Sequence, residues 1–79
     1  MKIISISEVD SLIGKKLAFA HIVPYGATIL LVMEDGTAAA VNQMSDGDGD
    51  FIGTEFLNER KVMEYIAHDA KLRHQLAAA

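Results

Sequence analysis

The chain has 79 residues, a mass of 8.6 kDa and no cysteine, which excludes disulfides, thiolate metal sites and cysteine nucleophiles. Its 51% apolar and 23% charged residues indicate one folded domain over residues 1–79. The net charge of −4 argues against direct binding of nucleic acid through a broad basic face. The apolar stretches are too short for a membrane helix or a signal peptide, so we expect a cytoplasmic protein that binds no membrane.

The first half of the sequence predicts a short strand, a helical turn and the strands of an antiparallel meander. Alternating or β-branched apolar residues indicate the strands, because successive side chains of a strand point to opposite faces. Gly14 is placed to end the helical turn in a left-handed conformation, and Pro24 and Gly26 indicate a turn between two strands. The expected elements are a strand at 2–6, a helical turn at 7–13 and strands at 16–23, 27–33 and 37–42.

An Asp35-Gly36 pair between two apolar runs predicts a tight hairpin, because both residues of a two-residue turn need positive φ. Such a turn places Met33 opposite Ala38 and Leu31 opposite Ala40. The strand that precedes the turn is apolar on both faces, so we expect it to be the central strand of the sheet. Its faces carry Ile29, Leu31 and Met33 on one side and Leu30 and Val32 on the other.

The second half predicts a loop followed by one long helix. Residues 43–53 are polar and contain three glycines, and neither glycine nor proline follows Thr54, the expected N-cap. The helix has a core stripe and a second apolar set on nearly the opposite side. The stripe is formed by Phe56, Met63, Ile66 and Ala70, and the second set by Tyr65, Leu72 and Leu76. The expected fold class is α+β: an antiparallel meander of three strands, or of four with the N-terminal strand, packed by one long C-terminal helix.

The acidity of the chain is concentrated in its middle, where residues 34–59 carry seven acidic side chains and no basic one. In this segment Asp46, Asp48 and Asp50 resemble positions 1, 3 and 5 of the calcium loop of EF-hand proteins, which places oxygen ligands on alternate residues. Phe51 stands where that loop has its turn glycine, and Leu57 where it has its bidentate glutamate. A calcium site and a solvated connection are therefore both open, and no other cofactor is expected.

The remaining residues give no sign of catalysis. His68 and His74 are six apart, so they lie on different sides of a helix and cannot chelate one metal ion, and His21 lies on a strand. The sequence contains none of the nucleophile or phosphate-loop motifs. We therefore expect a protein that is not an enzyme.

The function that fits these observations best is a small non-catalytic protein-interaction module. One helix covers one face of a sheet, so we expect a homodimer, with Tyr65, Leu72 and Leu76 as the helical contact. Asp46, Asp48 and Asp50 would present the acidic segment to a protein partner, as in regulators and inhibitors of the kind that phages encode. The alternative is a calcium- or metal-responsive binding module that uses the acidic loop at 46–55.

Overall fold

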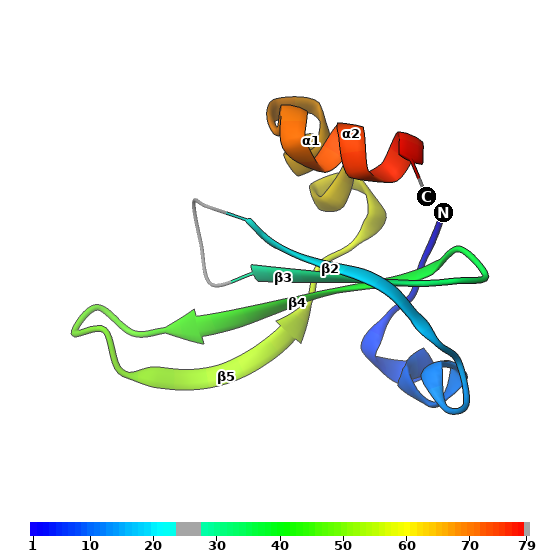
Figure 1. Ribbon diagram of the computed structural model, residues 1–79. Coiled ribbons are helices and arrows are strands. Elements are labelled where there is room, and N and C mark those ends of the chain that lie inside the picture. Colours follow the sequence, from blue (N-terminus) through cyan, green and yellow to red (C-terminus); the bar gives the residue numbers. More distant parts are fainter. Residues whose placement is uncertain (24–27, 79) are drawn as a thin grey trace.

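The computed structural model describes residues 1–23 and 28–78, which form a five-stranded mixed sheet with helices on both faces (Figure 1). The predicted α+β class and the antiparallel meander at its centre are confirmed. The expected turn at Pro24 and Gly26 lies outside the described residues. The strands are β1 (Lys2–Ile3), β2 (Leu17–Val23), β3 (Thr28–Met33), β4 (Thr37–Ser45) and β5 (Phe51–Phe56). The helices are the 3-10 helix η1 (Ile6–Leu12) and the α-helices α1 (Glu59–His68) and α2 (Ala70–Ala78).

The hairpin between β3 and β4 forms at the expected place but in another register. Val32 pairs with Ala38 and Leu31 with Ala39, so the expected pairing of Met33 with Ala38 is wrong by one residue. Gly36 has a φ of 89° and its N–H donates to the carbonyl of Met33, whereas no residue other than glycine among those described has positive φ. The loop therefore has three residues and ends in a left-handed glycine, a common alternative to the two-residue turn.

The segment expected to be a loop at 43–53 is mostly strand. β4 continues to Ser45, and β5 returns antiparallel to it, with Asn42 opposite Glu55 and Met44 opposite Gly53. Thr54, expected as a helix N-cap, lies inside β5. A Cβ atom on Gly53 would lie 3.1 Å from Cε of Met44, so this glycine lets the Met44 side chain pack closely across the pair.

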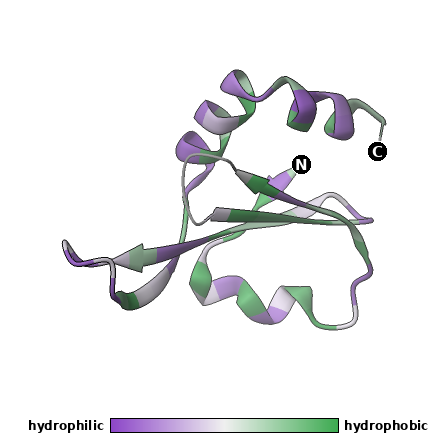
Figure 2. Cartoon of the chain, turned by 60° about the vertical axis from the view of Figure 1, so that its left-hand side comes forward, coloured by the Kyte–Doolittle hydropathy of each residue, from purple (hydrophilic) through white to green (hydrophobic). Residues whose placement is uncertain are grey.

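The N-terminal segment crosses to the other edge of the meander. β1 pairs in parallel with the start of β4, where the N–H of Lys2 donates to the carbonyl of Gly36 and the N–H of Ile4 to that of Ala38. η1 follows and begins where Oε1 of Glu8 accepts a hydrogen bond from the N–H of Ser5. Both Figure 1 and Figure 2 place η1 on the face of the sheet opposite α1 and α2.

The C-terminal region forms two helices, so the expected single long helix is wrong. Asn58 is the N-cap of α1, and its side chain accepts a hydrogen bond from the N–H of Lys61. α1 ends at Asp69, whose backbone is extended, with φ −125° and ψ 98°. The Asp69 side chain then accepts a hydrogen bond from the N–H of Leu72 in the first turn of α2. One residue thus ends one helix and caps the next.

The core lies between the sheet and these two helices. Leu30, Val32, Ala38 and Ala40 of β3 and β4 pack with Val62 of α1 and Leu72 of α2, and all six are 5% exposed or less. The small alanines allow the helices to approach the sheet closely. No helix among residues 1–23 and 28–78 is long and apolar enough to cross a membrane.

The opposite face of the sheet is covered at one end by η1, and no other element of the described residues lies over it. We call its uncovered apolar residues the open face, and they alternate along the strands with the core residues. Ile22 is 71% exposed and Ile29 is 42% exposed, although both lie within the sheet. The open face consists of the exposed Ile22 and Ile29 and the partly exposed Leu31, Val41 and Phe56.

Candidate functional site

The acidic residues form the tip of a projecting hairpin. β3 pairs with β4 only as far as Asn42, so the β4–β5 hairpin extends beyond the rest of the sheet (Figure 1). Within its turn, Oδ1 of Asp46 accepts hydrogen bonds from the N–H groups of Asp48 at 2.9 Å and Asp50 at 3.0 Å. Asp46 therefore shapes the turn. The carboxylates of Asp48 and Asp50 form no hydrogen bond or ion pair with the described residues, and both are exposed.

Two large apolar side chains follow the acidic turn directly. Phe51 is 59% exposed and Ile52 is 61% exposed. Figure 2 shows this change from hydrophilic to hydrophobic residues at the hairpin tip. These two residues were not among the expected contact residues, because residues 43–53 were expected to form a loop. The apolar pair Phe51-Ile52, followed by Phe56, was the available signal for a strand there.

The geometry of the turn gives the calcium alternative no support. Among residues 1–23 and 28–78, no group of three or more His, Asp or Glu side chains is arranged to hold a metal ion. One oxygen of Asp46 already accepts two backbone hydrogen bonds that define the turn. The helix that enters an EF-hand loop is replaced here by strand β4.

The structure separates the three residues expected to form a helical contact surface. Leu72 is fully buried in the core, and Leu76 packs against that core. Tyr65 on α1 is half-buried. Their assignment to one surface opposite the core is wrong because the break at Asp69 rotates α2 relative to a continuous helix. Leu72 cannot contact a partner without leaving the core.

His21 joins the sheet to both ends of the helical break. The ring is 9% exposed, its Nδ1 lies 2.9 Å from Oε1 of Gln75, and its Nε2 lies 2.8 Å from Oδ2 of Asp69. The N–H of Leu72, followed by the His21 ring, holds the pKa of Asp69 below its usual range. The arrangement uses both ring nitrogens for structure and leaves none free for catalysis or metal binding. His68 and His74 are exposed and lie on separate helices, whereas a single helix was expected to carry both.

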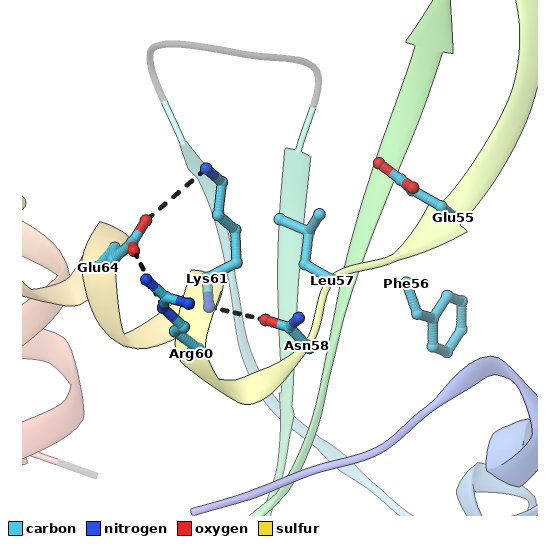
Figure 3. Close-up of a pocket in the computed structure, with 7 residues that line it drawn as sticks. All are labelled: Glu55, Phe56, Leu57, Asn58, Arg60, Lys61 and Glu64. Carbon is cyan, nitrogen blue, oxygen red and sulfur yellow. Dashed lines mark hydrogen bonds and ion pairs between the residues drawn. The ribbon is translucent and has the colours of Figure 1, made fainter.

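A pocket of about 410 Å³ lies where β5 leads into α1 (Figure 3). It contains two cations, Arg60 and Lys61, but Glu64 lies 3.8 Å from Nε of Arg60 and 3.6 Å from Nζ of Lys61. All three side chains are at least half exposed. Phe56 points away from the charged residues in Figure 3. The pocket is therefore a solvated cluster of neutralised charges and has no buried acid–base pair.

Comparison with known proteins assigns the chain to a viral family. Residues 3–79 match the model of the family described as Bacteriophage BPS1 gene 21 protein. The chain belongs to this family. The match covers nearly the whole fold, from β1 to α2, and confirms the expectation of a small phage protein. Neither the curated proteins nor the solved structures contain a match to this member of the phage family.

Proposed function

We propose that this phage-family protein is a non-catalytic, homodimeric interaction module that acts in the host cytoplasm as a regulator or inhibitor of a partner protein. The contact residues that we assign to the partner are at the tip of the β4–β5 hairpin. They comprise the free carboxylates of Asp48 and Asp50 and the exposed side chains of Phe51 and Ile52. Asp46 contributes by holding the turn in shape.

The exposure of Phe51 and Ile52 beside the carboxylates is the observation that carries this proposal. Large apolar side chains at a projecting tip gain free energy when a partner covers them, and aromatic residues are enriched where interfaces bind most strongly. The adjacent carboxylates favour a partner with a basic surface and raise the rate of encounter with it. A partner that normally binds phosphates offers such a surface.

A binding experiment with charge-matched variants tests the proposal. Immobilised protein would capture its partner from a lysate of the phage's host, and the affinity would then be measured with both components purified. We expect Asp48→Asn with Asp50→Asn to weaken binding about tenfold and to reduce its dependence on salt. This variant keeps Asp46, so the turn is preserved.

The matched control is Asp10→Asn with Glu34→Gln, which removes the same charge from exposed positions outside the hairpin. Phe51→Ser provides an apolar variant of the tip. Equal loss of affinity in the hairpin variant and the control would show that only net charge matters. Unchanged affinity in Phe51→Ser and the hairpin charge variant would place the contact elsewhere on the molecule.

A further inference from the structure

The open face is continuous across four strands. Ile22 pairs with Ile29, Ile29 with Val41, and Val41 with Phe56, so these residues form one cross-strand row. The next row toward η1 contains Leu31 between Ala20 and Ala39, and neither row contains a charged or polar side chain. In both views η1 lies over one end of this face, and no other element of residues 1–23 and 28–78 covers the rest.

The surface of the chain is larger than a compact monomer of its mass requires. The accessible surface is 5296 Å², whereas a compact protein of 8.6 kDa exposes about 4,700 Å². The radius of gyration is 12.8 Å, against about 11.6 Å for a compact chain of this length. The chain therefore exposes roughly 600 Å² more than a compact monomer, over the open face and the projecting β4–β5 hairpin together.

On this basis we propose that a second copy of this chain docks on the open face, with the two sheets packed face to face about a two-fold axis. The proposal rests on the homodimer in the proposed function and assigns its interface. The composition favours a second copy over a transient partner, because permanent homodimer interfaces resemble a protein core whereas transient ones are as polar as ordinary surface. Sheet-on-sheet packing of two apolar faces forms the core of β-sandwiches in the same way.

The projecting tip of the β4–β5 hairpin lies outside this interface. β3 pairs with β4 only as far as Asn42, and the register between β4 and β5 shifts between Met44 and Ser45, so an irregular stretch separates the tip from the open face. The acidic turn at 46–50, together with Phe51 and Ile52, therefore remains available to another protein.

The oligomeric state of surface variants tests this interface. Light scattering coupled to gel filtration should give about twice 8.6 kDa for the wild type at micromolar concentration. Ile29→Lys should weaken the dimer at least tenfold, because it places a charge in the centre of the buried face. The matched control is Met63→Lys on α1, which is 50% exposed on the other side of the molecule and should stay dimeric. Circular dichroism would check that both variants are folded.

The Ile29→Lys variant also distinguishes a face-to-face dimer from one that pairs at the sheet edge, where β2 is the terminal strand. A dimer that survives Ile29→Lys but is lost in Ile22→Lys would show edge-to-edge pairing and overturn the proposal. A wild type that stays monomeric at high concentration would overturn it as well, and would leave the hairpin contact to be judged by its own binding assay. Intermolecular NOEs between open-face methyl groups, in a mixture of labelled and unlabelled protein, provide a second measurement that needs no variant. Their absence in a dimer would place the interface elsewhere.

Discussion

Nε2 of His21 lies 2.8 Å from Oδ2 of Asp69, although the two residues are 48 positions apart in the sequence. The contact joins the edge strand β2 to the residue at which α1 ends and α2 begins. Oδ1 of the same carboxylate caps α2 through the N–H of Leu72. The position of α2 on the sheet therefore depends on a histidine that is 9% exposed and has a partner for each ring nitrogen.

Replacement of this histidine should loosen the helical layer. We expect His21→Ala to lower the free energy of unfolding by about 1–3 kcal/mol, because it leaves Asp69 and Gln75 without their partner in a poorly hydrated site. Urea unfolding followed by circular dichroism would measure the loss. His68→Ala is the control, since His68 is exposed. Equal stability of both variants would show that the contact contributes nothing.

Asp35 should titrate far below an ordinary aspartate. The side-chain hydrogen bond from Lys15, at 2.8 Å, and then the N–H of Thr37 lower the pKa of Asp35 to about 2. Because the folded-state pKa is below the unfolded value of about 3.9, this contact stabilises the fold above pH 4 and its contribution is lost as the pH falls toward 2. NMR titration of the carboxyl carbon would measure the pKa. In Lys15→Met it should rise toward the usual range, and an unchanged value would exclude Lys15 as the main cause.

The left-handed conformation of Gly36 should make this residue hard to replace. Gly36→Ala should cost about 1–2 kcal/mol in the free energy of unfolding. Nothing lies within 4 Å of the added Cβ, so the cost comes from a φ of 89° and not from a steric clash. Gly47→Ala is the matched control, because Gly47 has equal space and no positive φ. Thermal melts of both variants would decide, and equal melting temperatures would contradict the three-residue turn.

Because Leu72 is buried in the core, its replacement should lower the stability of the fold and not only the affinity of an interface. Leu72→Ala should cost about 2–5 kcal/mol, which is a large part of the stability of a chain this small. Chemical unfolding at several protein concentrations is the measurement. If the variant instead kept its stability and only became monomeric, Leu72 would belong to an intermolecular contact, as the sequence alone had indicated.

Calcium should leave the thermal stability unchanged. A melt in millimolar calcium should match one in chelator, since Asp46, Asp48 and Asp50 are not arranged around one ion. The triple replacement by asparagine keeps an acceptor oxygen at position 46 and is the control. A melting temperature that rises by several degrees in calcium, and only with the aspartates present, would restore the metal-responsive alternative.

Local sequence signals predicted the positions of most strands better than they predicted the turns and boundaries between elements. The Asp35-Gly36 pair marked the hairpin correctly, but the same pair serves both two-residue and three-residue loops, and only the latter leaves Asp35 at negative φ. The alternation of β3 predicted its two faces correctly. β5 was missed because Gly53 and the polar residues around it resemble a loop until Met44 packs across them.

The helix break could not be predicted from neighbouring residues. No glycine or proline interrupts the segment around Asp69, and the helix propensity of the alanine, lysine and leucine residues that flank it favours one continuous helix. The break is stabilised by His21, which reaches Asp69 from β2, and by Arg73, which donates hydrogen bonds to the carbonyls of Ile66 and Ala67 at the end of α1. The error in the candidate interface follows from this, because the angular positions of Leu72 and Leu76 were calculated for a continuous helix. The helix break and the orientation of Leu72 and Leu76 therefore depend on a contact between residues that are distant in the sequence.

The division of the C-terminal region into two short helices has a consequence for the order of folding. α1 and α2 have 10 and 9 residues, fewer than the ~12–15 that an isolated helix needs to be even marginally stable in water. Each must wait for the sheet before it can form. Residues 59–78 are also the last to be synthesised, so Leu30 and Val32 on the core side of the sheet have no cover until synthesis is complete. A chain truncated before residue 59 would keep this apolar side exposed and become a substrate for chaperones and proteases.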